Sequence, residues 1–220
     1  MAIRDINGGR HTYRFGKVEK RDLLISSVVL AVAFALLFRN SSSIKNYFVY
    51  YVGSSWVVWM FITMFILVIL SFVLHELGHK FTAQKLGFWS EYRMYPAGLV
   101  LSLVMSIVGF LIAAPGVTMI RGNVSKDDNG RISIAGPMVN IVLAAIGLVG
   151  VLLTNHTAAV LPFYLLFMLN ASLALFNLIP IPPLDGSKVL SWKPAVWIAC
   201  IAIAALEFAS IYMLPTLYFA

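Results

Sequence analysis

Long apolar runs alternate with short polar connections along most of this chain. A run of about 20 apolar residues is enough for a helix to cross the hydrocarbon core of a bilayer. The runs that reach or approach this length are 23–38, 47–74, 99–114, 132–153, 158–179 and 195–214, and only the last contains an acid, Glu207. They predict an all-α polytopic membrane protein with about five to six membrane segments.

The composition excludes an ordinary soluble domain. Hydrophobic residues make up 60% of the 220 residues and charged residues 11%, whereas soluble domains average about 45–50% and about 25%. The net charge of +7 would suggest nucleic-acid binding in a soluble protein, but the basic residues here flank the apolar runs, where anionic lipids attract them. We therefore expect the lipid bilayer as a partner and no nucleic acid.

The first 22 residues are polar and rich in Lys and Arg, and we interpret 1–22 as a basic cytoplasmic tail. Residues 23–220 form the predicted transmembrane domain. Its first run, 23–38, has only 16 residues, but Arg21 and Arg39 flank it and their long side chains can reach the membrane surface. We expect this run to be an uncleaved first helix rather than a signal peptide, because the tail before it is long.

The strongest chemical signal is the pentapeptide His75-Glu76-Leu77-Gly78-His79 at the end of the run 47–74. Residues four apart lie on one face of a helix, so both imidazoles can bind one metal ion with Glu76 beside them as a base. This spacing is that of a zinc site. The alternative is a structural cluster of polar residues at a helix end, although ionisable groups next to a long uncharged run usually pair or mark function.

A catalytic zinc ion usually has three protein ligands and one open position, so the histidine pair requires a third ligand. Asp185 and Glu207 are the acids beside or inside the later apolar runs. Asp185 stands out because it follows a proline-rich bend at 180–183, and irregular backbone at membrane depth must line a cavity or pack against protein. Alternatively, Asp185 and Gly186 form only a helix-end turn.

Three segments together carry a resemblance to a known family. They are 75–79, the stretch Asn177-Leu178-Ile179-Pro180-Ile181-Pro182-Pro183-Leu184-Asp185-Gly186, and between these Ala135-Gly136-Pro137-Met138-Val139-Asn140. With these motifs the chain resembles the site-2 protease family of intramembrane zinc metalloproteases over about residues 65–186. We expect a short form of the family, without a PDZ or CBS domain, with the core of the transmembrane metalloprotease domain at about 47–186.

The resemblance implies a role for each site residue. His75, His79 and Asp185 would bind one Zn²⁺, and Glu76 would be the catalytic residue. Asn177 matches the asparagine that precedes the prolines in the family, and its amide could bind the substrate backbone or the developing oxyanion. Asn140 is a second candidate for substrate binding, and both amides could instead hydrogen-bond between helices.

The charge pattern gives an independent prediction of topology. With the tail inside, His75 and Asp185 reach the same side only if the run 99–114 dips into the membrane and returns. All but Arg39 and Lys45 of the 16 basic residues then lie inside, in agreement with the positive-inside rule. We therefore expect a re-entrant segment around 99–114 and a multi-pass protein of the cell membrane, with its N-terminus and active-site side cytoplasmic.

The predicted activity is zinc-dependent hydrolysis of peptide bonds within or near transmembrane segments of membrane-anchored protein substrates. The resemblance implies this substrate class. The alternative is a cation or proton-coupled transporter that uses the same His, Glu and Asp cluster, although the chain shows no inverted repeat. Glu207 has no role in the family motifs, and a gate, a proton path and an interhelical hydrogen bond are all open for it.

Overall fold

The computed structural model describes residues 15–39, 41–109, 115–154 and 158–213, and the backbone of residues 3, 4, 10 and 11. The helices are α1 (Lys17–Phe38), α2 (Ser42–Val52), α3 (Trp56–Val68), α4 (Leu74–Lys85), α5 (Pro96–Val108), α6 (Lys126–Leu153), α7 (Val160–Asn177), α8 (Asp185–Trp192) and α9 (Pro194–Ser210). The strands are β1 (Ile3–Arg4), β2 (Arg10–His11), β3 (Trp89–Met94) and β4 (Gly116–Arg121). The protein is thus an all-α membrane protein with little strand, as the apolar runs predict.

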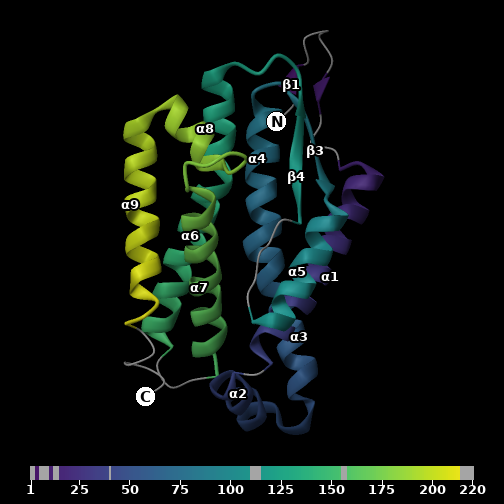
Figure 1. Cartoon of the computed structure of the whole chain (residues 1–220), viewed down its shortest axis with the longest axis vertical. Coiled ribbons are helices and arrows are strands. Elements are labelled where there is room, and N and C mark those ends of the chain that lie inside the picture. The colour runs from purple at the N-terminus through teal and green to yellow at the C-terminus, as the bar shows by residue number, and fades with distance from the viewer. Residues whose placement is uncertain are drawn as a thin grey trace.

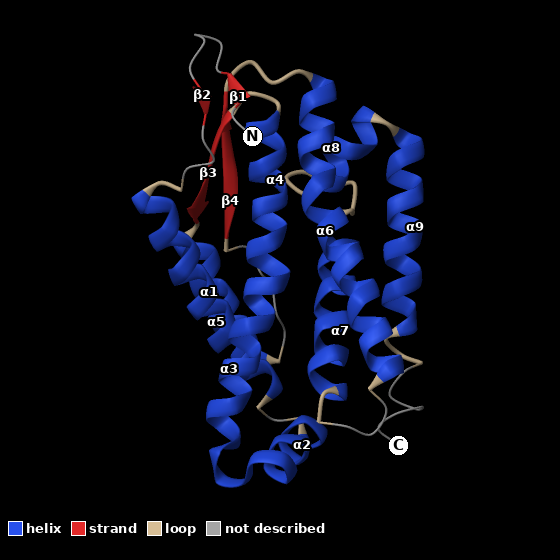
Figure 2. Ribbon diagram, turned by 180° about the vertical axis from the view of Figure 1, so that it is seen from behind, coloured by secondary structure: helices blue, strands red, loops and turns tan. Residues whose placement is uncertain are grey.

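Helix α6 is the central element of the bundle and packs against α4, α7, α8 and α9 (Figures 1 and 2). Its contact with α7 depends on glycines. A Cβ atom on Gly147 would lie 2.5 Å from the backbone nitrogen of Phe167, and one on Gly150 would overlap the ring of Phe163. Small residues let two membrane helices approach this closely, which increases their van der Waals contact.

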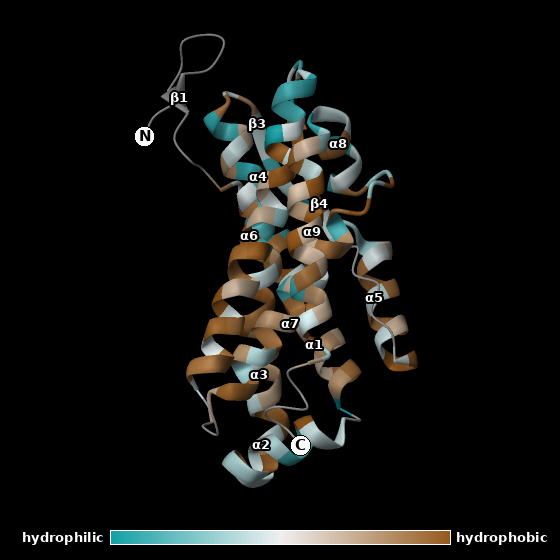
Figure 3. Ribbon diagram, turned by 90° about the vertical axis from the view of Figure 1, so that its left-hand side faces the viewer, coloured by the Kyte–Doolittle hydropathy of each residue, from teal (hydrophilic) through white to brown (hydrophobic). Residues whose placement is uncertain are grey.

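Among the described residues, four helical stretches are long and apolar enough to cross a membrane: 17–38, 42–85, 126–153 and 160–177. The stretch 42–85 joins α2, α3 and α4 through a 3₁₀ turn at Gly53–Ser55 and a π-helical turn at Ile69–Val73. Helices α5 and α9 are apolar but shorter. Figure 3 shows hydrophobic residues through the middle of the bundle and hydrophilic residues gathered at the end that carries α8.

The predicted re-entrant run lies between two strands that the sequence did not predict. Strands β3 and β4 pair antiparallel, with Met94 opposite Gly116 and Trp89 opposite Arg121. Helix α5 leaves the sheet after Met94, and the chain rejoins it at Gly116 (Figure 1). The chain thus leaves the sheet and returns to it at two residues that face each other, Met94 and Gly116. Residues 110–114 lie outside the described part of the chain, and the re-entrant path stays a prediction.

The first helix begins at Lys17, inside the segment that we interpret as a tail from its polarity. Two of the acids in that segment are buried rather than solvated. Glu19 Oε1 accepts a hydrogen bond from the backbone N–H of Tyr92 at 3.0 Å, and Asp22 Oδ2 accepts one from Met94 at 3.3 Å. Helix α1 is therefore fixed to β3 by carboxylates. The other end of the predicted tail, residues 1–14, lies almost entirely outside the described residues.

Candidate metal centre

The pentapeptide at 75–79 lies on α4, directly after the π-helical turn Ile69–Val73. The side chains of His75, Glu76 and His79 are buried, each with less than a tenth of its surface exposed. Such single π turns inside α-helices often occur at functional sites. The motif therefore stands at the end of an apolar helical stretch and faces the interior of the bundle, not the lipid.

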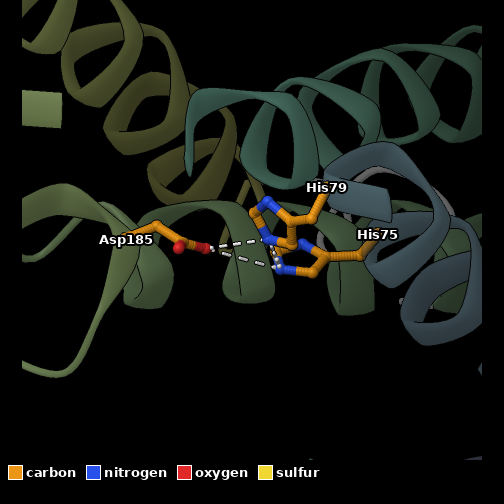
Figure 4. Close-up of side chains that lie close together, drawn as sticks. All are labelled: His75, His79 and Asp185. Carbon is orange, nitrogen blue, oxygen red and sulfur yellow. Dashed lines mark hydrogen bonds and ion pairs between the residues drawn. The ribbon is translucent and has the colours of Figure 1, made fainter. Parts of the chain in front are cut away.

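Asp185, the first residue of α8, completes a group of three potential metal ligands with the two histidines (Figure 4). Its Oδ2 atom is 3.1 Å from His79 Nε2 and 3.6 Å from His75 Nε2. The two Nε2 atoms are 3.0 Å apart. Residues 110 positions apart in the chain thus converge on one point, and Asp185 occupies the third-ligand position while Glu207 does not join this group.

The second ring nitrogen of each histidine faces an oxygen atom. His75 Nδ1 is 2.5 Å from Asn140 Oδ1, and His79 Nδ1 is 2.8 Å from the backbone oxygen of Ile132. These oxygens accept hydrogen bonds, so each Nδ1 carries a proton, and in the neutral ring each Nε2 has a free lone pair. With neutral rings, two lone pairs and a carboxylate face one another, and such groups repel unless a proton or a metal ion lies between them.

The spacing of the three atoms fits a zinc ion. Ligand atoms at about 2.0–2.1 Å from a tetrahedral zinc ion are about 3.3–3.4 Å from one another. The observed separations of 3.0, 3.1 and 3.6 Å bracket this value. Two imidazoles and one carboxylate are also a usual donor set of catalytic zinc sites, which keep a fourth position open for water or substrate.

Glycines let α6 pack directly against the ligand helix. A Cβ atom on Gly136 would lie 2.3 Å from His79 Nε2 and 2.7 Å from His75 Cε1. Both distances are shorter than the van der Waals contact between a methyl group and an imidazole ring. A Cβ atom on Gly78 would lie 2.9 Å from the backbone oxygen of Ala135. Side chains at these two positions would push the histidines away from the point at which they meet Asp185.

Asp185 is positioned by a tight turn between α7 and α8. Here a Cβ atom on Gly186 would lie 2.1 Å from the backbone oxygen of Leu178, so the turn requires a glycine. At the other end of α8, Trp192 Nε1 donates a hydrogen bond to Asp127 Oδ1 of α6 at 2.6 Å. Its ring lies directly against Gly130 of α6. Helix α8 is therefore held at both ends.

The carboxyl group of Asp185 is held in its charged form. Burial alone would raise its pKa, but positive charge on the neighbouring imidazoles of His79 and His75 outweighs burial and keeps the pKa well below its usual range. Lys188 Nζ adds a positive charge 3.4 Å from the other carboxylate oxygen. A carboxylate ligand must be ionised to bind a metal, so Asp185 is suited to this role at neutral pH.

Glu76 is not one of the converging ligands, and its carboxylate is held by a residue of β4. Thr118 Oγ1 lies 2.7 Å from Glu76 Oε2, to which it donates a hydrogen bond, and 3.3 Å from the backbone oxygen of Glu76. Both side chains are buried. The role of Glu76 as the base stays a prediction, and its carboxylate is held by a residue that the sequence did not indicate.

The contacts of Asn140 differ from those expected of a substrate-binding residue. Its side chain is fully buried, and besides His75 it contacts Ser71 and Asn170. Its Nδ2 donates to the backbone oxygen of Ser71 at 2.9 Å and to Asn170 Oδ1 at 2.8 Å. Because all its polar atoms are engaged inside the protein, Asn140 supports a histidine and does not face a substrate.

Asn177 and Glu207 are the two remaining residues that the sequence singled out. Asn177 is half-buried at the end of α7, and its Nδ2 donates to the backbone oxygen of Leu173 at 2.9 Å. Its role in substrate binding stays a prediction. Glu207 is buried in α9, and its Oε2 atom has no hydrogen-bond partner among the described residues.

One charged pair beside the site has no signal in the sequence. Lys80 Nζ lies 2.7 and 2.6 Å from the two oxygens of Glu19, and both side chains are almost completely buried. The same ammonium group lies over the ring of Phe15, 4.6 Å from its centroid. The charge pattern includes Lys80 among the basic residues that set the topology, but this lysine pairs with an acid inside the fold.

Comparison with known proteins gives four relatives whose names describe zinc metalloproteases, of which three are described here. The chain is 36% identical over 188 residues to a candidate zinc metalloprotease of Methanocaldococcus jannaschii, MJ0611, and the match covers 84% of this chain and 90% of that protein. It is 32% identical over 128 residues to the zinc metalloprotease MJ0392 of the same organism, covering 58% of this chain and 33% of that protein.

A bacterial relative gives the same indication. A candidate zinc metalloprotease of Bacillus subtilis, YwhC, is 32% identical over 148 residues, and the match covers 57% of this chain and 66% of that protein. The chain therefore spans a third of MJ0392 and somewhat less than two thirds of YwhC. No family model matches the chain, and no solved structure matches it. With nearly the whole of MJ0611 matched and a His, His, Asp centre in place, the chain belongs to a family of zinc metalloproteases.

Proposed function

We propose that this chain is an intramembrane zinc endopeptidase of the site-2 protease family, which cleaves peptide bonds within or near transmembrane segments of membrane-anchored proteins. The observation that carries the proposal is the convergence of His75, His79 and Asp185 on one point, at the end of an apolar helical stretch. Glu76 follows the first of these histidines on the same helix. The names of the relatives support a zinc peptidase and do not favour the transporter alternative.

Each residue of the centre has a distinct task in this proposal. When bound, zinc supplies a Lewis acid that polarises the scissile carbonyl and lowers the pKa of a water molecule. His75, His79 and Asp185 provide its ligands. Glu76 takes a proton from the attacking water and later gives it to the departing amine. Asn177 is the proposed donor of a hydrogen bond to the substrate backbone or the developing oxyanion.

The substrate must reach the centre in an extended form. A transmembrane helix hides its carbonyl groups in internal hydrogen bonds, so cleavage requires local unwinding. Strand β4 packs beside α4 and pairs on one side with β3. Its side chains Val117 and Met119 are exposed. We propose that an unwound, apolar substrate segment adds to β4 as a further strand, because an exposed strand edge supplies main-chain partners for an extended peptide.

The orientation that we propose has the N-terminus and the metal centre on the cytoplasmic side. Lys188 belongs to α8 and Lys193 directly follows it, whereas Lys45 belongs to α2 and Arg39 precedes it by three residues; α8 and α2 lie near opposite ends of the bundle (Figure 1). This distribution follows the positive-inside rule without Lys80. Reporter fusions to the N-terminus and to the connection between α6 and α7 would test it, and the two reporters must respond on opposite sides.

The test of the proposed function compares two substrates with the purified, reconstituted protein. One is a membrane-anchored protein with a transmembrane segment, and the other is the soluble flanking peptide of the same protein. We expect cleavage of the anchored substrate, with the cut mapped by mass spectrometry to the apolar segment, and loss of cleavage with a zinc chelator. Cleavage confined to the soluble peptide would contradict intramembrane action.

The variant Glu76→Gln tests the base. It leaves the three ligands in place, so zinc content should stay near that of the wild type while cleavage falls by about 10²-fold or more, the usual contribution of a general base. Glu91→Gln is the matched control, because Glu91 is a partly exposed acid on β3 whose carboxylate pairs with Arg93. Retained cleavage in Glu76→Gln would remove Glu76 from the mechanism. Metal-dependent cation flux without cleavage would favour transport.

A further inference from the structure

Strand β4 has a burial pattern that is the reverse of an ordinary surface strand. Its apolar residues Val117 and Met119 are exposed at 58% and 46%, while the hydroxyl-bearing Thr118 between them is 8% exposed. Thr118 lies opposite Tyr92 in the sheet register, and Tyr92 is itself fixed by hydrogen bonds to Ser26 and Glu19. A polar side chain in this position needs a partner inside the protein.

That partner is the carboxylate of Glu76. The hydroxyl of Thr118 donates to Glu76 Oε2 at 2.7 Å, a normal length for a hydrogen bond to a charged oxygen. Its second contact, with the backbone oxygen of Glu76 at 3.3 Å, is longer. A hydroxyl has one proton to donate, so the shorter contact takes it and the longer one adds little.

We propose that Thr118 is a positioning residue for the peptidase reaction, which holds Glu76 with Oε2 occupied and Oε1 free to act as the base. This inference rests on the proposed function. The two oxygens of a carboxylate are equivalent in an isolated glutamate, and rotation about the last side-chain bond exchanges them at little cost. The hydrogen bond from Thr118 removes this equivalence, because exchange would break it in a buried site.

The arrangement has a direct consequence for the proton that Glu76 carries. The O–H bond of the attacking water breaks, its proton moves to Oε1, and its electron pair stays with the attacking oxygen. Oε2 remains an acceptor throughout and keeps its bond from Thr118. The proton therefore stays on Oε1, the oxygen that Thr118 does not occupy, until the departing amine takes it. Without Thr118 the carboxyl group turns, and the fraction of time spent in the productive geometry falls.

Paired substitutions at position 118 separate positioning from packing. Thr118→Val keeps the shape and removes the hydroxyl, while Thr118→Ser keeps the hydroxyl and removes a methyl group. We expect Thr118→Val to lower kcat about 10- to 100-fold, the range seen when groups that orient a reacting residue are lost. Its KM and zinc content should stay within about twofold of the wild type by the same reasoning, because no metal ligand changes. Thr118→Ser should restore kcat to near the wild-type value.

The control variant is Thr154→Val. It also removes a hydrogen-bonded hydroxyl, since Thr154 Oγ1 donates to the backbone oxygen of Gly150 at 2.6 Å, but at the far end of α6 from the metal centre. Its kcat should not change. If Thr118→Val loses zinc, its fold is disturbed, and Thr118→Ala then gives the comparison with Thr118→Ser without a new methyl group in the buried site.

Three outcomes would overturn the inference. A wild-type kcat in Thr118→Val would show that the hydroxyl does not orient Glu76. Equal losses in the serine and alanine variants would assign the effect to packing of the missing methyl group. A change in KM alone would place Thr118 in substrate binding instead. The proposed function fails separately, if the wild-type protein shows no metal-dependent cleavage or if Glu76→Gln retains it.

Discussion

Replacement of Asn140 by leucine should weaken zinc binding without touching a zinc ligand. Asn140 Oδ1 is the 2.5 Å partner of His75 Nδ1 and fixes the proton on that nitrogen. Leucine has a similar volume but no acceptor, so the ring of His75 loses its preferred tautomer and orientation. Loss of such a partner typically lowers metal affinity by about 10- to 100-fold, which corresponds to about 1.4–2.8 kcal/mol of binding free energy.

The same substitution should also destabilise the metal-free protein. Asn140 Nδ2 donates to the backbone oxygen of Ser71 and to Asn170 Oδ1, and leucine leaves both acceptors buried without this donor. An unsatisfied buried group costs about 1–3 kcal/mol. Two separate measurements are therefore predicted to change: zinc affinity by competition with a chelator, and the free energy of unfolding of the metal-free protein in detergent.

Asn170→Leu is the matched control for this prediction. Asn170 is buried in the same network, where its Nδ2 donates to Ser71 Oγ and to the backbone oxygen of Leu166, but it does not contact His75. We expect a comparable loss of unfolding free energy and a much smaller change in zinc affinity. Equal losses of zinc affinity in the two leucine variants, or unchanged affinity in Asn140→Leu, would refute the assignment of Asn140 to His75.

Three further substitutions test the way the centre is built. Gly136→Ala places a methyl group within 2.3–2.7 Å of the two imidazoles, so metal analysis of the purified variant should find little zinc, and full occupancy would contradict the proposed close packing. Lys80→Met leaves the buried carboxylate of Glu19 without its ionic partner and should lower the free energy of unfolding by about 3–5 kcal/mol. Adding Glu19→Gln should recover much of this loss, and strictly additive losses in the double variant would argue against the pair. Trp192→Phe removes the hydrogen bond to Asp127. The free energy of unfolding should then fall by about 1 kcal/mol, and the affinity for zinc should fall several-fold. An unchanged zinc affinity would show that this contact does not position α8.

The metal centre was predictable because its parts obey local rules. Helical periodicity alone puts His75 and His79 on one face, and the structure places their Nε2 atoms 3.0 Å apart. The proline-rich bend marks Asp185 as an acid on irregular backbone beside an apolar run, and the acid in α9, Glu207, does not join the ligands. The long apolar runs likewise predict the helical stretches that carry these residues.

The supporting contacts were not predictable, because they join residues far apart in the sequence. Glu19 and Lys80 are 61 positions apart, and in the sequence each looks like an ordinary charge beside a membrane helix. The sequence did not indicate Thr118 for a different reason. In a soluble strand an alternating pattern sends apolar residues inward, whereas in β4 the apolar residues face outward and the threonine faces the protein. In β4, therefore, the polar residue of the alternating pattern is the one that faces the protein interior.

The carboxylates of α1 also limit where a further strand can add to the two-stranded sheet of β3 and β4. Tyr92 and Met94 of β3 direct their backbone N–H groups away from β4, and Glu19 and Asp22 accept both. Exposed strand edges are sites at which chains associate into extended β-aggregates. With the edge of β3 covered by a helix, the edge of β4 is the one that remains for the strand addition that we propose. A substrate bound in this way would be a single added strand, and the covered edge of β3 would keep two protein molecules from pairing there.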